Sequence, residues 1–226
     1  MALSRSMENY VKTIYELQQE AEWVSTSALA KRLEHAPASV TNMIKKLAEP
    51  GLNLVEYVPY QGTRLTPVGE KVALEVIRHH RLIELYLAEV MGIPWDQVHD
   101  EAERIEHVIS EDVEDRMAAA LGQPTFDPHG SPIPARGGDM VDRLVRPLAE
   151  LEVGQSAVIA EVYDENARLL RYLGELGLYP NGLITLLARE PFGGPLKIQV
   201  HDTEAEQNVS ETVAKLISVM VVEAFD

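Results

Sequence analysis

The chain has 226 residues, of which 46% are hydrophobic and 25% are charged, and it contains no cysteine. These values are typical of one or two globular domains, and the lack of cysteine excludes disulfides, thiolate metal sites and cysteine nucleophiles. The longest stretch without a charged residue has 13 residues, from Leu176 to Ala188, whereas a membrane-spanning helix needs about 20 apolar residues. The N-terminus also lacks the apolar core of a signal peptide. We therefore expect a soluble cytoplasmic protein with no membrane partner.

The negative charge is unevenly distributed along the chain. The net charge is −16, yet the first 65 residues contain seven basic and seven acidic side chains. All of the excess negative charge therefore lies after residue 65. An N-terminal part without this excess can approach the phosphate backbone of a nucleic acid, which the rest of the chain would repel.

The N-terminal part of the chain has the pattern of a small DNA-binding domain. Apolar residues recur at helical spacing in three segments, and two β-prone runs follow them on either side of a turn. The predicted helices and hairpin cover residues 6–20, 28–33, 38–48 and 54–65. Three helices with a tight turn between the second and the third, followed by a hairpin, are typical of a winged helix-turn-helix domain.

The remainder of the chain is predicted to be helical first and β-rich later. Thr66 and Pro67 can begin a long helix that extends to about Met91, and two further helices are predicted over residues 94–109 and 111–121. Four prolines and four glycines fall within residues 122–139, which is typical of a linker. The later β-prone runs, with one helix between them, predict a small SH3-like barrel; the runs cover residues 153–162, 183–188, 196–200 and 217–222 and the helix covers 166–174.

The third predicted helix carries a polar face opposite its apolar stripe. Short hydroxyl and amide side chains near the start of such a helix can reach base edges, and lysines further along can bind phosphates. We predict that the DNA-binding residues are Ser39, Thr41, Asn42, Lys45 and Lys46 on this helix, with Thr26 and Ser27 at the start of the helix before it. A lone polar face would more often be a solvated surface, but the neighbouring helix and hairpin favour a recognition helix.

Two helical segments each combine histidine with glutamate. Glu103, Glu106 and His107 are spaced three and four residues apart, which places them on one face if the helix continues through them. His99 lies one turn earlier, and a second pair, His80 and Glu84, is spaced four apart on the long helix. Imidazole and carboxylate groups at such spacing suit a divalent cation that prefers oxygen and nitrogen ligands. The alternative is a surface rich in salt bridges.

The other histidines have no comparable set of partners. We therefore interpret them as surface or packing residues; they are His35, His79, His129 and His201.

Four segments together resemble the diphtheria toxin repressor family of iron- and manganese-dependent repressors. They are Ser6–Leu17 (SMENYVKTIYEL), Arg78–Leu82 (RHHRL), Val98–His107 (VHDEAERIEH) and Asn166–Leu170 (NARLL). The resemblance implies a mainly α protein with small β elements that binds double-stranded operator DNA as a homodimer when loaded with manganese(II) or iron(II). It implies four regions: a winged helix-turn-helix domain over 1–66, a helical dimerisation and metal-binding domain over 67–121, a Pro/Gly-rich linker region over 122–147 and an SH3-like domain over 148–226.

The resemblance also implies the metal ligands. Asn9, Glu103, Glu106 and His107 fall on the primary site of the family, and His80, Glu84 and His99 fall on its ancillary site. The SH3-like domain is expected to complete the ancillary site with one of Glu161, Asp164 or Glu165. Two departures from the family pattern count. Glu103 stands where iron-type members have a cysteine and manganese-type members have a glutamate. The second departure lies in the first helix. Asn9 stands where members usually have Met or Asp, and Lys12 stands where manganese-type members have Glu.

We therefore expect a metal-dependent transcriptional regulator, a repressor of metal-uptake genes without catalytic residues or an organic cofactor. Two alternatives from other classes remain at this point. One is a winged-helix interaction protein without metal control, whose histidine–glutamate pairs are salt bridges. The other is a metalloenzyme that uses the same cluster, which would leave the winged helix unexplained.

Overall fold

The structure is a computed structural model that describes residues 3–222. The chain divides into two compact units, which are described separately. The N-terminal unit comprises the residues up to His79 together with Glu106–Ile109 and Pro134–Asp139. The C-terminal unit comprises His80–Ile105, Ser110–Ile133 and the residues from Met140 onward. No helix within residues 3–222 has the length and the apolar composition needed to cross a membrane.

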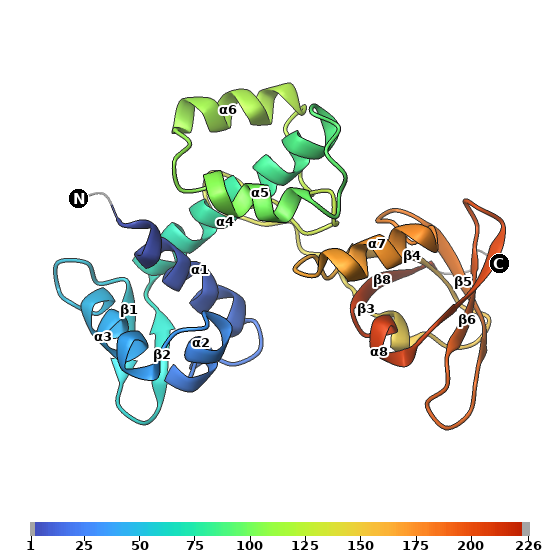
Figure 1. The fold of residues 1–226 in the computed structure, drawn as a ribbon, viewed down its shortest axis with the longest axis horizontal. Helices are drawn as coiled ribbons and strands as arrows, with labels where there is room; N and C mark the ends of the chain where they lie inside the picture. The colour runs from blue at the N-terminus through green and yellow to red at the C-terminus, as the bar shows by residue number, and fades with distance from the viewer. Residues whose placement is uncertain (1–2, 223–226) are drawn as a thin grey trace. The chain divides into compact units, whose positions relative to one another are not determined.

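The N-terminal unit contains the winged helix-turn-helix pattern that the sequence predicts (Figure 1). Its elements are α1 (Arg5–Gln18), α2 (Thr26–Arg32), α3 (Pro37–Leu47), β1 (Val55–Val58) and β2 (Gly62–Leu65), followed by the first half of α4 (Pro67–Glu89). The hydroxyl groups of Ser4 and Ser25 accept hydrogen bonds from the first turns of α1 and α2, and Pro37 begins α3. These are the residue types that helix starts favour.

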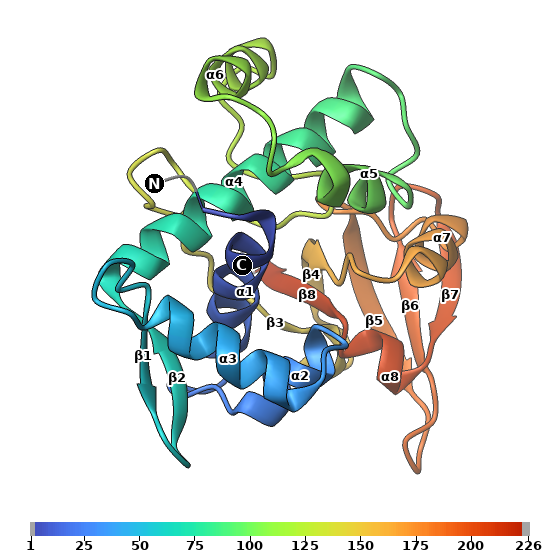
Figure 2. The ribbon, with the colours of Figure 1, turned by 60° about the vertical axis from the view of Figure 1, so that its left-hand side comes forward.

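The apolar faces of the three short helices and the hairpin form one core. Its fully buried side chains include Ile14, Leu29, Ile44 and Leu47. The hairpin strands pair antiparallel from Val55↔Leu65 to Val58↔Gly62, and the exposed Tyr60 lies in the turn between them. Figure 2 shows α3 between α2 and the hairpin. The helix buries its apolar stripe in this core, and its opposite side remains exposed.

The helices that follow differ from the sequence prediction in one respect. The structure contains α5 (Val98–Ile105) and α6 (Glu111–Ala120), whereas one helix was predicted over 94–109. Glu106 and His107 therefore lie in a turn after α5, and the expectation that they share a helix face with Glu103 is wrong. The Glu106 carbonyl oxygen contacts the His79 ring at 3.2 Å, and Ser110 has an extended backbone that caps α6, so the helix cannot continue.

The C-terminal part of the chain forms a six-stranded antiparallel sheet in the order β3-β8-β4-β5-β6-β7. The strands are β3 (Arg146–Pro147), β4 (Ser156–Val162), β5 (Leu183–Arg189), β6 (Leu196–Val200), β7 (Ala205–Val209) and β8 (Ile217–Val222). The short helices are η1 (Leu148–Glu150), α7 (Ala167–Glu175) and α8 (Glu211–Ala214). The sheet and α7 enclose a second apolar core that includes Ile159, Leu170 and Leu173. This arrangement confirms the predicted SH3-like fold class.

The strand β7 was not predicted, because only Val209 among its five residues is buried. Its sequence, AEQNV, therefore lacks the apolar alternation that identifies a half-buried strand. The pairing of β7 with β6, from Leu196↔Val209 to Val200↔Ala205, depends on the neighbouring strand rather than on a hydrophobic pattern.

The irregular segment between α6 and β3 is held against β4 within the C-terminal unit. The His129 carbonyl accepts a hydrogen bond from the Val162 backbone N–H at 3.0 Å. Gly130 approaches the backbone so closely that a Cβ atom built on it would lie 2.0 Å from the carbonyl oxygen of Ala160. Arg143 donates hydrogen bonds to the carbonyl groups of both Gly130 and Ala160. This part of the predicted linker is therefore attached to the sheet.

This attachment predicts a large difference between two glycine substitutions. Gly130 and Gly154 both have a φ of 90°, but nothing lies within 4 Å of a Cβ added to Gly154. Gly154→Ala should therefore lower the free energy of unfolding by only about 1 kcal/mol, through backbone strain. Gly130→Ala should lower it by about 2–4 kcal/mol, because the new Cβ atom also clashes with β4. Urea unfolding followed by Trp95 fluorescence in a Trp23→Phe background measures both. Equal losses would contradict the close approach of Gly130 to β4.

Candidate metal centres and nucleic-acid interface

The predicted DNA-binding residues lie at the start of α2 and along α3. Ser27, Ser39, Asn42, Lys45 and Lys46 are exposed, and Thr26 and Thr41 are half-buried. The Thr41 hydroxyl donates to the Pro37 carbonyl at 2.9 Å, which leaves only its acceptor capacity for another partner. The exposed side of α3 thus combines one amide with two lysines, a combination that can bind both base edges and phosphates.

A hydrogen bond joins α1 to the turn of the helix-turn-helix. The hydroxyl of Tyr10, a residue that is only 2% exposed, lies 3.0 Å from His35 Nδ1. His35 is exposed as expected, but its link to α1 was not predicted, because the two residues are 25 positions apart. The link connects the helix that carries Asn9 with the turn that precedes α3.

Polar residues of α1 meet the turn after α5 within the N-terminal unit. Lys12 Nζ lies 3.2 and 3.0 Å from the two carboxylate oxygens of Glu106, and Glu8 Oε2 lies 2.7 Å from His107 Nδ1. His107 Nε2 is 3.1 Å from Glu106 Oε1. Among the described residues, neither this nitrogen nor the buried Asn9 Oδ1 has a hydrogen-bond partner. We call these five residues the α1 cluster.

The orphaned atoms of the α1 cluster are potential metal ligands. Buried polar atoms normally have a partner, so the buried Asn9 Oδ1, which has no hydrogen-bond partner among the described residues, indicates a group that these protein atoms do not supply. Burial disfavours the charged imidazole of His107, but Glu106 and Glu8 raise its pKa above the ordinary value. The negative charge that attracts this proton can equally attract a divalent cation. The structure therefore brings the predicted ligands Glu106 and His107 together beside α1, the helix that carries Asn9.

A second group of predicted ligands surrounds Glu84 in the C-terminal unit. Glu84 Oε1 lies 2.9 Å from His80 Nε2 and 3.1 Å from His99 Nδ1. Glu103 Oε1 lies 3.9 Å from His80 Nδ1, so Glu103 is beside the expected ancillary ligands. His80, His99 and Glu103 each offer one ligand atom within 4.8 Å of the others.

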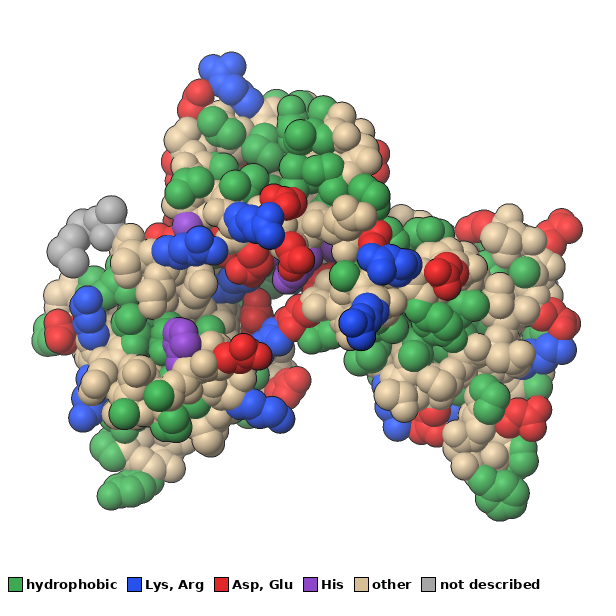
Figure 3. Space-filling model, viewed as in Figure 1, with side chains coloured by type: hydrophobic (Ala, Val, Ile, Leu, Met, Phe, Trp, Pro, Cys, Tyr) green, Lys and Arg blue, Asp and Glu red, His purple; other side chains and the backbone are tan. Residues whose placement is uncertain are grey.

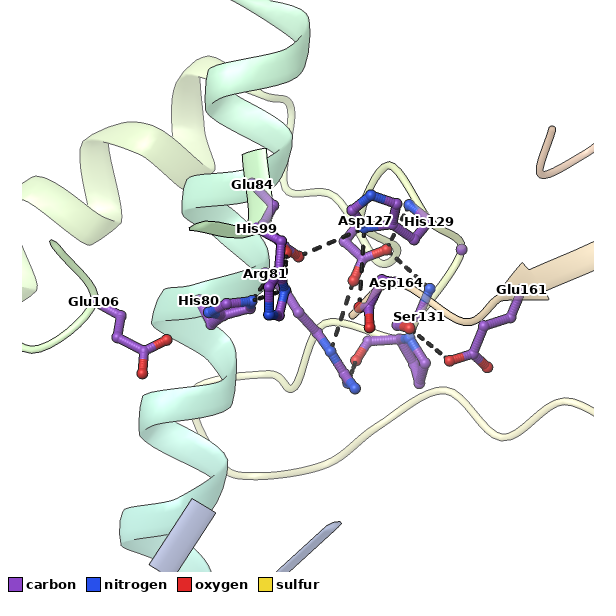
Figure 4. A network of polar contacts seen from close by, with 12 residues as sticks. His80, Arg81, Glu84, His99, Glu106, Asp127, His129, Ser131, Glu161 and Asp164 are labelled. Carbon is purple, nitrogen blue, oxygen red and sulfur yellow. Dashed lines mark hydrogen bonds and ion pairs between the residues drawn. The ribbon is translucent and has the colours of Figure 1, made fainter. Parts of the chain in front are cut away.

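The other oxygen of Glu84 faces three residues that Figure 4 shows pointing toward one another. They are Asp127, His129 and Asp164, and together with Glu84 they offer four ligand atoms within 4.8 Å of one another. His129 Nδ1 is 3.8 Å from Glu84 Oε2 and 3.9 Å from Asp164 Oδ2. These separations exceed a hydrogen bond, but donors about 2.1 Å from one cation lie about 3–4 Å apart. We call these four residues the Glu84 cluster.

The orientation of His129 and Asp127 is set by the backbone. His129 Nε2 lies 2.8 Å from the Trp95 carbonyl oxygen, so it carries a proton and donates it, which leaves Nδ1 facing the carboxylates. Asp127 Oδ1 accepts from the backbone N–H groups of His129 and Ser131 at 2.8 and 2.9 Å, and Asp127 Oδ2 lies 3.7 Å from Arg81 Nε. Such fixed orientation by outer contacts is typical of metal ligands. Glu84 Oε2, Asp127 Oδ2 and His129 Nδ1 are buried without a hydrogen-bond partner among the described residues.

The Glu84 cluster combines three carboxylates with one imidazole, and the basic side chain of Arg81 lies beside it, with Arg81 Nε 3.7 Å from Asp127 Oδ2. Burial by itself would raise the pKa of Glu84, but His80, His129 and His99 hold it well below the usual range. Burial and the charge of Glu84 raise the pKa of Asp127 to about 7. Burial opposes the charged form of His129, yet the surrounding carboxylates raise its pKa to about 9. The cluster therefore retains protons at neutral pH, and a divalent cation can replace them.

The three expected ligands from the SH3-like part lie in different surroundings. Glu161 accepts from the Ser131 hydroxyl at 2.5 Å, and Glu165 accepts from the Tyr163 hydroxyl at 2.6 Å. Asp164 alone among the three belongs to the Glu84 cluster.

His129 and Asp127 are the residues that sequence reasoning missed. His129 was expected to be a surface or packing residue, and it is completely buried among carboxylates. Its approach to Glu84 arises from the path of an irregular segment, which helical spacing cannot reveal. The one available signal was the Asp127-Pro-His129 sequence, which places two ligand types within the predicted linker.

Three family models together match most of the chain. The iron-dependent repressor N-terminal DNA-binding domain matches residues 2–63, and the iron-dependent repressor metal-binding and dimerisation domain matches residues 66–135. The FeoA domain matches residues 146–221.

Individual proteins show the same similarity. The iron-dependent repressor IdeR of Mycobacterium tuberculosis is 34% identical over 209 residues, which cover 86% of this chain and 89% of that protein. The diphtheria toxin repressor of Corynebacterium diphtheriae is 37% identical over 149 residues, 66% of this chain and 60% of that protein. A solved manganese-dependent transcriptional repressor in complex with manganese has a TM-score of 0.86 and 34% identity, and the match covers 96% of this chain and all of that one. ScaR with bound Cd2+ has a TM-score of 0.78 and 30% identity, covering 96% and 99%.

Proposed function

This chain belongs to the iron-dependent repressor family, and from that premise we propose that it is a metal-dependent transcriptional repressor of metal-uptake genes in the cytoplasm. Manganese(II) or iron(II) is its corepressor, and double-stranded operator DNA is its ligand. The family consists of DNA-binding repressors rather than enzymes, so the metalloenzyme alternative has no support. The observation that carries the proposal is the combination of an exposed α3 with buried ligand atoms that lack partners.

The ligand types of both clusters favour manganese(II) and iron(II). The α1 cluster offers carboxylate and amide oxygens with one imidazole, and the Glu84 cluster offers three carboxylates with one imidazole. Hard oxygen donors suit these cations, whereas thiolates, which the chain lacks, would favour copper(I) or zinc. In the proposed assignment Asn9, Glu106 and His107 hold one cation. His80, Glu84, His99 and Glu103 surround the second position together with Asp127, His129 and Asp164.

The α1 cluster can transmit metal binding to the DNA-binding helices. A cation held by Asn9, Glu106 and His107 fixes α1 against the turn that joins α5 to α6. The same helix contacts the helix-turn-helix through Tyr10 and His35. A ligand shifts a conformational equilibrium only by its differential affinity for the two states. The metal therefore favours DNA binding to the extent that it binds more tightly when α1 is held in place.

A homodimer explains the exposed apolar side chains on the helices of the C-terminal unit. Val90 and Met91 after α4 and Val113 on α6 are 53%, 62% and 43% exposed. Figure 3 shows hydrophobic side chains gathered over α6. Apolar patches of this kind mark protein–protein contacts. Two half-sites spaced by about one helical turn of DNA can be bound together only by a dimer.

The function is tested by selecting operators from random double-stranded DNA with and without manganese(II). We expect one palindromic sequence to be enriched with manganese and none to be enriched without it. Enrichment that is independent of metal would favour the interaction-protein alternative. Zinc(II) in a matched titration should bind but activate poorly, because a cation that prefers four ligands reaches Asn9 less readily.

The assignment of Asp164 predicts a difference between neighbouring carboxylates. Asp164→Asn should lower the number of manganese ions bound per chain by one, because it removes a charged ligand of the Glu84 cluster. Glu165→Gln should leave the number unchanged, because Glu165 is exposed and bound to Tyr163. Equilibrium dialysis with metal analysis measures both. An identical loss in the two variants would contradict the assignment.

The assignment of α3 predicts separable roles for Asn42 and Lys46. Asn42→Ala should weaken binding to the selected operator by about 1–3 kcal/mol and relax its sequence preference. Lys46→Ala should weaken binding to all DNA alike and reduce the slope of log affinity against log salt by about one. Binding measurements over a salt series distinguish the two effects. If Asn42→Ala binds the operator with wild-type affinity and selectivity, α3 does not read bases through this residue.

A further inference from the structure

We propose that Lys12 is an internal competitor for the metal in the α1 cluster. Its ammonium holds Glu106 in the metal-free protein, and it must release at least one carboxylate oxygen before a divalent cation can bind there. The inference rests on the proposed function and adds to it a residue that sets the metal affinity of this site. It also limits the site to one cation per chain.

The contact between Lys12 and Glu106 is close and buried. Lys12 Nζ lies within hydrogen-bond distance of both oxygens of Glu106, at 3.2 and 3.0 Å. The side chain of Lys12 is 10% exposed and that of Glu106 is completely buried. A buried carboxylate requires a compensating positive charge, and the ammonium supplies it with two of its three donors. A divalent cation approaching Glu106 therefore meets a carboxylate that already has its counter-ion.

The ammonium does not satisfy the other ligand atoms of the cluster. Asn9 Oδ1 remains buried without a hydrogen-bond partner among the described residues, and His107 Nε2 faces Glu106 Oε1 at 3.1 Å. Both atoms can ligate a metal. The Lys12 ammonium, three residues along α1 from Asn9, does not hydrogen-bond either of them. The carboxylate of Glu106 thus already has a cation, whereas Asn9 Oδ1 has no hydrogen-bond partner among the described residues.

Electrostatics make the competition direct. A divalent cation bound to Glu106 and His107 would lie within a few ångströms of the Lys12 ammonium, and like charges at that separation repel strongly in a buried site. The four-carbon stem of lysine is flexible, so the ammonium can move away when the metal enters. The metal must compensate for this displacement, which raises the concentration at which the site fills.

The same contact limits the number of cations. Both oxygens of Glu106 are engaged by Lys12, so releasing one oxygen admits one cation. A second cation sharing Glu106 would require the ammonium to leave completely.

The test compares Lys12→Met with Lys71→Met in the full-length protein. Methionine retains an unbranched apolar stem and removes the charge, and Lys71 is an exposed lysine of α4 outside the cluster. Both variants are made in an Asp164→Asn background, which is expected to remove the manganese bound at the Glu84 cluster. Isothermal titration calorimetry with manganese(II) then reports mainly on the α1 cluster. We expect Lys12→Met to bind manganese at least tenfold more tightly than its parent and Lys71→Met to bind as the parent does. Unchanged or weaker binding in Lys12→Met would overturn the proposal.

Thermal unfolding provides a second measurement that does not depend on DNA. Without metal, Lys12→Met should unfold at a lower temperature because Glu106 loses its counter-ion, and manganese should raise its Tm more than that of the parent. If Lys12→Met does not fold without metal, Lys12→Gln serves instead, because glutamine keeps a hydrogen-bond donor without the charge. An equal manganese-induced rise in Tm for variant and parent contradicts the proposal. Failure of the parent itself to bind manganese would instead contradict the proposed function.

Discussion

The buried carboxylate of Glu84 organises the polar interior of the C-terminal unit. Removing a carboxylate from water costs several kcal/mol unless the protein surrounds it with compensating groups. His80 and His99 meet one oxygen, and the other oxygen faces His129. Helices α4 and α5 and the irregular segment after α6 therefore converge on a single negative charge. Asp127 and Asp164 place two further carboxylates beside it, and Arg81 lies 3.7 Å from Asp127, so acidic and basic groups are concentrated in this region.

Each of the two clusters contains a buried carboxylate, and different basic groups compensate its charge. Glu106 is paired with an ammonium, whose charge is permanent at neutral pH. Glu84 is surrounded by imidazoles, which can give up a proton and then act as ligands. The α1 cluster must consequently move a side chain to accept a metal, whereas the Glu84 cluster need only lose protons. The distinction follows from the chemistry of lysine and histidine and predicts that the two positions fill at different metal concentrations.

Local sequence patterns predicted the elements of the fold but only part of the candidate sites. The contact between His80 and Glu84 follows from their spacing of four on a helix, and the helices of the N-terminal unit follow from apolar periodicity and serine caps. The pairing of Lys12 with Glu106 joins residues 94 positions apart, and no local pattern contains it. The burial of His129 likewise depends on the path of a segment whose prolines and glycines resemble those of a linker. Sequence spacing identifies ligands that share a helix, and tertiary packing determines the others.

The attachment of the irregular segment to β4 makes the SH3-like sheet part of the support of the Glu84 cluster. The hydrogen bond from Val162 to His129, the close approach of Gly130 to Ala160 and the contact of Ser131 with Glu161 all fix the segment that carries two ligands of the Glu84 cluster. A chain shortened before β3 would lose Asp164 and also the support that orients His129. Deletion of the sheet would therefore change the surroundings of Glu84 even if every residue of helices α1 to α6 were kept, because Asp164 would be lost and His129 would lose its hydrogen bond with Val162.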